Sequence, residues 1–462
     1  MEQQFENQIS GGGVSKTVKS SVSSSSKLLN LEYPYKTSWD KNKNSVEFEI
    51  RGCNVSLINS IRRSIISAVP TVGFRSEPYE KSTIEIIIND SPLHNQFIAH
   101  RISMVPLYIA NVEAFDPNNF EFILDVSNNT NFNMDITTEH FKIKDIRKNT
   151  FLSQSETRKI FPPNPITNDY ILITRLKPRY YQFGKVINQD ILRNYKDTVA
   201  DDMSEHSKIS SEQEVKIYVK ARAVIGTGAE NGHFNPTSCS CYSYKMDPEK
   251  VKLAEREFID NETQKLLEKG LTPYSEESLK KRFSTTLAER HFHTDARGNP
   301  YWFNFKIETI GTIPPLVIFY RALHIMKNKI RNFNSMLIKN DSSSIKIEPS
   351  KDLLNGYKLI ITGEDDTLGT VIHTYLTNMY ADYALEPDHR ILNYVGYVRP
   401  HPLEMKLLIT IQPTNPSMMW QDILENMINP ACKKIVSDIA AIEVELEASS
   451  AYNSELKRIN VL

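Results

Sequence analysis

Two consecutive arginines, Arg62 and Arg63, are the residues whose type and spacing point most directly to binding chemistry. A guanidinium group can hold a carboxylate or backbone carbonyl groups through two parallel hydrogen bonds, which suits it to a protein interface. Around the pair, apolar residues recur every three or four positions, at Ile58, Ile61, Ile65 and Val69. This period predicts an amphipathic helix. Because the arginines lie off the apolar stripe, they are either contacts for a partner or part of a solvated face.

The predicted helix has a clear start and a clear end. Asn54 or Ser56 can cap its first turn. Pro70 ends it, because the residue before a proline avoids the helical region. Residues 45–51 alternate apolar and polar side chains, which predicts a strand. A strand therefore leads directly into the arginine helix.

The four cysteines do not form a recognisable site. They are Cys53, Cys239, Cys241 and Cys432, too few and too scattered for a disulfide scaffold, so a reduced intracellular setting is the simpler interpretation. Cys239-Ser-Cys241 lacks both the spacing and the second ligand pair of a zinc site. We therefore interpret these residues as ordinary thiols.

A short segment rich in metal-binding side chains lies further along the chain. His291 and His293 stand near Glu289 and Asp295, and these four side chains could hold a metal ion. Local clusters of this kind usually lie in surface loops, however. We favour the loop and expect no metal here.

Two other motifs have a structural and a functional interpretation. Gly226-Thr-Gly228 with Gly232 suggests a dinucleotide-binding loop, but the spacing is wrong and no acidic residue follows at the required distance. A structural turn is favoured for these glycines. His100-Arg101 is as compatible with a buried, hydrogen-bonded pair as with a contact surface, and both interpretations stay open.

Four segments resemble the α-type subunits of multisubunit RNA polymerases, in residues and in order. Gly52–Arg63 resembles the signature of their first helix, and Gln96–Leu107 resembles a second shared stretch. Lys220–Gly228, continued by His233–Thr237, resembles a third. Phe303–Pro314 resembles the strand before their long helix. The family includes the third-largest subunit of eukaryotic polymerases and the bacterial α subunit.

The last quarter of the chain resembles a different subunit. Glu364–Gly369 and Tyr394–Leu403 are similar to the small eleventh subunit of eukaryotic polymerase II, which in that enzyme is a separate chain. A fusion of the two resembles polymerases of large cytoplasmic DNA viruses. The resemblance therefore implies a viral source, with a location in the cytoplasmic viral factory and the virion, or in the nucleus if the source is cellular.

The apolar pattern of strand, short helix, strand and long helix occurs twice. We expect an α/β (α+β) fold of two pseudo-two-fold-related halves, with a mostly β domain inserted in the first. The expected parts are a disordered leader (1–32), a first half (33–76 plus 299–340), the insertion (77–298), a linker (341–349), a second half (350–448) and a C-terminal tail (449–462). The apolar faces that should join the halves include Leu323, Met326, Ile330, Val371, Leu376 and Ile439.

The resemblance implies a non-catalytic assembly platform for the second-largest and largest polymerase subunits and for small subunits. Polymerase catalysis needs clustered carboxylates that hold magnesium ions, and the aspartate-rich motif of the largest subunit is not found here. Magnesium therefore belongs to the catalytic subunit, and we expect no cofactor of this chain's own. The family's zinc loop is not carried over, because no cysteine occurs between Phe74 and Lys220.

Composition agrees with this role. The formal net charge is −1, whereas proteins that grip DNA themselves usually carry a basic excess, so DNA should be reached through the complex. No apolar run is long enough to span a bilayer. With both halves in one chain, no homodimer is required.

The family's first helix receives the second-largest subunit, which makes Asn59, Arg62 and Arg63 the matching contact candidates and His100 and Arg101 weaker ones. The alternative is a free-standing binding protein or regulator that uses the same fold, such as a decoy for polymerase subunits. A decoy would need only one half, so the presence of both favours the assembly subunit.

Overall fold

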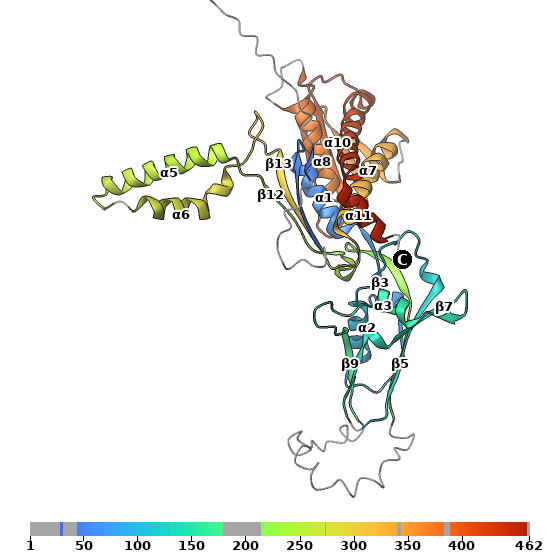
Figure 1. The fold of residues 1–462 in the computed structure, drawn as a ribbon. Coiled ribbons are helices and arrows are strands. Elements are labelled where there is room, and N and C mark those ends of the chain that lie inside the picture. Colours follow the sequence, from blue (N-terminus) through green and yellow to red (C-terminus); the bar gives the residue numbers. More distant parts are fainter. Residues whose placement is uncertain are drawn as a thin grey trace, which may run out of the picture.

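The computed structural model describes residues 28–30, 44–130, 132–178, 214–272, 274–339, 343–382 and 389–459. The expected leader up to residue 27 and the first linker residues therefore lie outside the described part. Figure 1 shows three regions: long helices gathered at one end, a β-rich body at the other, and a two-helix arm that projects sideways.

The first sheet lies beside the helices and has the antiparallel order β1-β2-β13-β12. The strands are β1 (Leu29–Asn30), β2 (Ser45–Arg51), β12 (Thr237–Tyr244) and β13 (Trp302–Thr309). The strand expected at 45–51 is confirmed, and its apolar side chains Val46, Phe48 and Ile50 are buried. The ring of Phe48 packs edge-on against Phe319 of the long helix, with 4.8 Å between centroids.

The arginine helix is α1 (Val55–Ser67), and it is capped by Asn54, whose side chain accepts a hydrogen bond from the Leu57 N–H at 2.9 Å. Pro70 begins the next strand, β3 (Pro70–Phe74), so the predicted helix end is confirmed. The long helix α7 (Pro315–Lys339) follows β13, as expected.

The second sheet has the antiparallel order β14-β15-β17-β16. Its strands are β14 (Ile345–Pro349), β15 (Tyr357–Thr362), β16 (Leu392–Val398) and β17 (Lys406–Pro413). Residues 345–349 were expected in a linker but form the edge strand β14. Strand β17 begins only at Lys406, because the Arg399 side chain donates to the carbonyls of Pro402 and Glu404 and holds the preceding segment as a turn.

Helix α8 (Asp366–Leu376) follows β15. Its cap is Asp365, whose carboxylate accepts the Thr367 N–H at 3.1 Å. After the π-helical turn η9 (Thr377–Ala381) and the second half of the sheet come α9 (Trp420–Ile423), a second π-helical turn η11 (Leu424–Ile428) and α10 (Asn429–Glu447). Pro430 lies in the first turn of α10, where a proline is tolerated because the N–H that it lacks would have no partner within the helix.

Helices α1, α7, α8 and α10 pack together (Figure 1), with α1 and α7 also contacting the first sheet and α8 the second. The six side chains expected in this core are completely buried: Leu323, Met326, Ile330, Val371, Leu376 and Ile439. Lys327 of α7 and Glu443 of α10 form an ion pair inside the bundle. Burial of a few charged groups is tolerated here because they are paired.

The β-rich body is built on a five-stranded antiparallel sheet of order β4-β10-β5-β7-β8. Its strands are β4 (Ile84–Asn89), β5 (Phe120–Asn128), β7 (Phe141–Asp145), β8 (Thr150–Phe151) and β10 (Val215–Ala221). Two ribbons accompany it, β3 with β11 (Ala223–Thr227) and β6 (Met134–Thr137) with β9 (Leu172–Leu176). Among its described residues, the helices of the body are α2 (Asn95–Ser103) and α3 (Gln154–Ile160), with short 3-10 turns that include η1 (Tyr79–Lys81) and η7 (Gly232–Phe234).

The arm consists of α5 (Pro248–Glu268) and α6 (Glu276–Thr286). The region expected as one insertion, 77–298, is therefore divided, because β12 lies within it and pairs with β13 in the first sheet. The residues of β12, Thr-Ser-Cys-Ser-Cys-Tyr-Ser-Tyr, have no apolar alternation, so periodicity could not assign this strand to a core sheet. The body and the arm are two separate insertions in the first half.

The chain ends of the described part also differ from expectation. Residues 28–30 were expected in the disordered leader, yet β1 pairs with β2, and Glu445 of α10 accepts the N–H groups of Leu28 and Leu29. Within the expected tail, residues 450–459 form α11 (Ser450–Ile459), which packs on α7. Glu455 of α11 accepts the Leu316 N–H at 2.8 Å and so satisfies one of the unpaired donors at the start of α7.

The glycine motif has a structural role. Gly226 lies in β11 against the ring of Phe234, and a side chain on Gly228 would place its Cβ 2.1 Å from the carbonyl oxygen of Ile66. The next residue, Ala229, donates its N–H to the carbonyl of Ser67 at 2.8 Å. Backbone therefore approaches backbone at the end of α1, which only glycine permits.

Candidate functional site

Arg63 points from α1 to the start of α8. Its Nη2 lies 3.2 Å from Oδ2 of Asp365, and its Nε donates to Oγ1 of Thr367 at 3.0 Å. One turn earlier on α1, the buried Ser60 hydroxyl donates to the Thr367 carbonyl at 3.2 Å. The first half of the chain therefore holds the N-terminus of a second-half helix through side chains of α1.

Lys329 of α7 completes this network. Its Nζ lies 2.7 Å from Oε2 of Glu364 and 3.5 Å from Oδ1 of Asp365. Burial by itself raises the pKa of the Asp365 carboxyl, but Lys329, the Thr367 hydroxyl and Arg63 outweigh burial, so this pKa lies below its ordinary value. Asp365 is thus held ionised at the N-terminus of α8, where the helix dipole also favours negative charge.

Arg62 is oriented differently. Its Nε donates to Oδ1 of Asn59 one turn away on the same helix, at 3.0 Å, and both residues are half-buried. In the described part of the chain no hydrogen bond from its two Nη groups is found. The neighbouring strand on this side is β12, where burial raises the pKa of the Tyr242 hydroxyl and the charge of Arg62 partly opposes that effect. The two adjacent arginines therefore differ: Arg63 contacts the second half of the chain, while the Nη groups of Arg62 make no hydrogen bond to a described residue.

His100 and Arg101 lie elsewhere, on α2 in the β-rich body, whereas α1 lies with the long helices (Figure 1). Both side chains are exposed, so the buried-pair interpretation is wrong. Nη2 of Arg101 donates to the Leu172 carbonyl at 3.0 Å. The candidate contacts inferred from the sequence thus fall on two separate surfaces.

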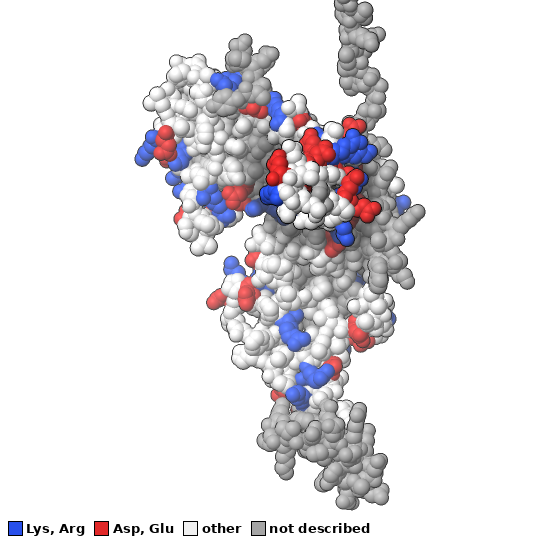
Figure 2. Space-filling model, turned by 90° about the vertical axis from the view of Figure 1, so that its left-hand side faces the viewer, with Lys and Arg blue, Asp and Glu red and all other residues white. Residues whose placement is uncertain are grey.

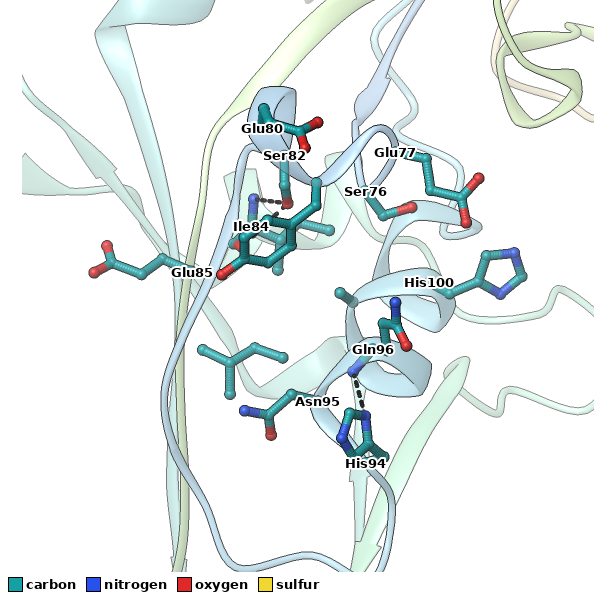
Figure 3. A pocket seen from close by; sticks show the side chains of 13 residues that line it. Ser76, Glu77, Glu80, Ser82, Ile84, Glu85, His94, Asn95, Gln96 and His100 are labelled. Carbon is teal, nitrogen blue, oxygen red and sulfur yellow. Dashed lines mark hydrogen bonds between the residues drawn. The ribbon is translucent and has the colours of Figure 1, made fainter.

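His100 lines a groove of about 810 Å³ between η1, β4 and α2. Figure 3 shows its lining, which comes from the segment 76–86 and from the first turns of α2. Three glutamates, Glu77, Glu80 and Glu85, take part, while the described lining residues include no lysine or arginine. Sequence reasoning missed this groove. The available signal was the three glutamates, Glu77, Glu80 and Glu85, that precede the Gln96–Leu107 segment.

The clusters considered for metal binding have other partners. Nδ1 of His293 lies 3.4 Å from Oδ2 of Asp247, and its ring stacks on Trp302 with 4.6 Å between centroids. The ring of His291 stacks on Phe283. Among the residues that the structure describes, no group of three or more His, Cys, Asp or Glu side chains is arranged to hold a metal ion.

The cysteines fall into two kinds. Cys239 and Cys241 lie on β12 with 3.7 Å between their sulfur atoms. Cys53 and Cys432 are buried, and burial raises the pKa of each thiol to about 12. The buried pair is thus kept as neutral thiols at physiological pH.

The surface charge is mixed. Figure 2 views the molecule from the side of the arm and shows basic and acidic side chains interspersed on this face, without a continuous basic stripe. None of the helices in the described residues combines the length and the apolar character that crossing a membrane requires.

Comparison with known proteins relates this chain to transcription. It is 22% identical over 330 residues to a conjugation stage-specific protein of Tetrahymena thermophila, which covers 65% of this chain and 94% of that protein. It is 21% identical over 301 residues to the RPAC1 subunit of RNA polymerases I and III of Saccharomyces cerevisiae, 61% of this chain and 81% of that subunit. Against RNA polymerase II subunit RPB3 of Schizosaccharomyces pombe, the identity is 32% over 80 residues.

These matches differ in extent. The RPB3 match covers 17% of this chain and spans only a quarter of that subunit's length, 25%. The sequence pattern of the RNA polymerase Rpb3/Rpb11 dimerisation domain, in contrast, matches residues 47–330, more than half of the chain. This segment contains most of β2, α1, the β-rich body, β12, the arm, β13 and most of α7. The chain therefore belongs to the family of the RNA polymerase Rpb3/Rpb11 dimerisation domain.

Proposed function

We propose that this chain is a non-catalytic assembly subunit of a DNA-directed RNA polymerase, in which one polypeptide supplies both halves of an α-type heterodimer. The observation that carries the proposal is the four-helix contact of α1 and α7, from the first half, with α8 and α10, from the second half. The match to the dimerisation family covers α1 and most of α7.

The arrangement of the two sheets supports a pseudo-two-fold relation. In the orders β1-β2-β13-β12 and β14-β15-β17-β16 the strands correspond one by one. In each half the second strand of that order leads into the shorter helix, α1 or α8. The third leads toward the long helix, α7 or α10. Both halves thus present one short and one long helix, and the apolar faces of these helices are buried against each other.

Polar contacts also join the halves. Arg63 of α1 and Lys329 of α7 meet Asp365 at the start of α8. Lys327 of α7 pairs with Glu443 of α10. Covalent linkage makes such pairing intramolecular, at an effective concentration on the order of millimolar. No second copy of the chain is then needed.

In this proposal the second-largest subunit contacts Asn59 and Arg62 on α1. Arg62 suits the role because its Nη groups are not engaged by described residues. Arg63 contributes indirectly by orienting α8, while His100 and Arg101 belong to a second contact surface on the body. The largest subunit and small polymerase subunits complete the assembly.

Chemistry and DNA contact reside in the partners under this proposal. Magnesium is held by the catalytic subunit, and this chain brings no cofactor of its own. The resemblance of its two ends to the third and eleventh subunits supports a fused gene. A viral source, acting in the host cytoplasm and packaged in the virion, is proposed on that resemblance alone; for a cellular source the location is the nucleus.

A free-standing regulator that uses the same fold is the second candidate. No specific contact favours it, and two complete sheets with their helices exceed what a decoy for one subunit needs. Purification of the tagged full-length chain from its source separates the two. We expect the two largest polymerase subunits and RNA synthesis activity to co-purify in fixed ratio. A chain recovered alone, while polymerase activity stays in another fraction, would overturn the assignment.

The contact residues need their own test. Arg62→Ala should leave the chain folded and weaken capture of the second-largest subunit about 30-fold, because truncating a central interface arginine commonly costs about 2 kcal/mol or more. Arg62→Ala with Arg63→Ala should weaken capture at least as much, and Arg63→Ala alone is the matched control. Undiminished capture by a well-folded double variant would show that these arginines of α1 are not part of the interface with the second-largest subunit.

A further inference from the structure

Strand β4 has an open edge. It lies at the end of the five-stranded sheet and, in the described part of the chain, pairs on one side only, with β10. The groove lined by His100 runs along the other side. Glu85 lines it together with Ile84 and Ile86, although neighbouring residues of a strand point to opposite faces. Residues from both faces can line one groove only where the groove follows the edge of the strand.

The backbone hydrogen bonds agree with this geometry. Arg222 donates its N–H to the Thr83 carbonyl at 2.9 Å, and Glu85 pairs with Lys220 two residues further on. Bonded pairs alternate in an antiparallel ladder, so the backbone groups of Ile84 and Ile86 point to the open edge. The Ser82 hydroxyl confirms this direction, because it bonds both the N–H and the carbonyl of Ile84, each at 3.3 Å (Figure 3).

The edge is short. The register between β4 and β10 shifts after Ile86, where Ile87 forms a bulge, and bulges commonly end strand pairing along an edge. The groove therefore offers one run of strand, from Ile84 to Ile86, partly occupied by Ser82. Exposed, unpaired strand edges of this kind are recurring sites for peptide addition.

The side chains around the edge select the charge of the occupant. Glu77, Glu80 and Glu85 are exposed at the groove, and its described lining contains no lysine or arginine; Lys220 of β10, outside the lining, lies opposite Glu85. Tyr79, at the η1 end, is 85% exposed and stands between two of these residues in the chain. An exposed aromatic ring beside carboxylates suits a lysine or arginine, which it can meet through a cation–π contact.

We propose that the β4 groove binds an extended, basic segment of another polymerase subunit, which adds a short strand to β4. This inference rests on the proposed function for the identity of the partner, while the chemistry of the groove stands without it. The strand run supplies backbone hydrogen bonds, and the glutamates with Tyr79 hold lysine or arginine side chains of the incoming segment. An acidic groove of this kind disfavours nucleic acid and acidic segments.

The first test uses the purified full-length chain and three labelled peptides. They are an alternating lysine–valine hexapeptide, the matching glutamate–valine peptide, and the lysine–valine peptide with N-methylated backbone amides. Fluorescence anisotropy should detect binding of the first peptide only, weakening as ionic strength rises. Equal binding of the N-methylated peptide would overturn strand addition, since that peptide keeps its charge but cannot donate ladder hydrogen bonds.

Three variants assign the binding to the groove. Glu77→Gln with Glu80→Gln should weaken binding of the lysine–valine peptide about fivefold, in keeping with the loss of two exposed ion pairs. Glu139→Gln with Glu289→Gln changes the net charge equally at exposed residues that do not line the groove and should leave affinity unchanged. Ser82→Ala frees the Ile84 backbone groups and should tighten binding about two- to tenfold. Equal weakening by both glutamate pairs would overturn the groove assignment.

The second test uses the polymerase as it is isolated. A photo-reactive phenylalanine analogue at Tyr79 should cross-link to a lysine- or arginine-rich extended segment of another subunit, whereas the same analogue at Tyr274 on the arm should not reach that segment. If the chain co-purifies with polymerase but Tyr79 captures an acidic or helical segment, or nothing, the inference fails and the proposed function stands. If the peptide binds but the chain is not in a polymerase, the proposed function fails and the groove chemistry stands.

Discussion

The guanidinium group of Arg63 lies 3.2 Å from the carboxylate of Asp365, a residue 302 positions further along the chain that caps the N-terminus of α8. The pair connects the first-half helix α1 to the second-half helix α8, and Lys329 of α7 joins it from the side. One arginine of an adjacent pair thereby becomes an internal connection between two parts of the chain that the sequence separates widely.

Replacing Arg63 by alanine should lower the free energy of unfolding by about 1 kcal/mol or less, because its side chain is 40% exposed and solvent screens the ion pair. Arg62→Ala is the matched control. It loses only the bond to Asn59 within its own helix and should cost less still. Urea unfolding followed by circular dichroism compares the two. A larger loss for Arg62→Ala would contradict the division of roles between the arginines.

Asp365→Asn should make the free energy of unfolding less dependent on pH in the acidic range. The pKa of Asp365 is lowered in the folded chain, so its contribution is fully present above the unfolded value near 3.8 and is lost as pH falls through the folded value. Asparagine still caps a helix, so the substitution removes mainly the charge. The wild type should be the more stable protein at neutral pH, and the difference should vanish in acid. A difference that persisted unchanged to low pH would show that charge is not the cause.

Leu323→Ala and Leu376→Ala should each cost roughly 2–5 kcal/mol, because both side chains are completely buried in the four-helix contact and their removal leaves a cavity. Leu354→Ala, at a residue that is 83% exposed, should have little effect on the melting temperature. Differential scanning calorimetry of the three variants is the measurement. Unchanged melting temperatures for both core variants would mean that these apolar faces do not hold the halves together.

Gly228→Ala should destabilise the chain by about 1–3 kcal/mol, or prevent folding, because the added Cβ would lie 2.1 Å from the Ile66 carbonyl oxygen and force the end of α1 away from β11. Gly232→Ala is the control, since a Cβ there meets nothing within 4 Å. Soluble yield and thermal melting distinguish them. Equal behaviour of the two variants would mean that the backbones do not approach this closely.

The amino-acid sequence by itself determined the local elements and their buried sides. Period and capping residues predicted β2 at 45–51, α1 with its end before Pro70, and the long helix after Pro314. The structure confirms each of them. These features depend on neighbours within a few residues, and alternation or a helical period is enough to specify which side chains turn away from water. The six apolar residues assigned to the core are buried for that reason.

Only the tertiary structure decided which distant residues meet. The polar strand β12 joins the first sheet because β13 offers it an edge, not because of its own pattern. Arg63 acts internally because packing of α1 on α8 brings Asp365 within reach, while Arg62, one residue away, points elsewhere. The β4 groove exists because η1, β4 and α2 pack side by side. Such contacts depend on how whole elements pack, and a one-dimensional pattern of apolar residues specifies a buried face but not the partner that covers it.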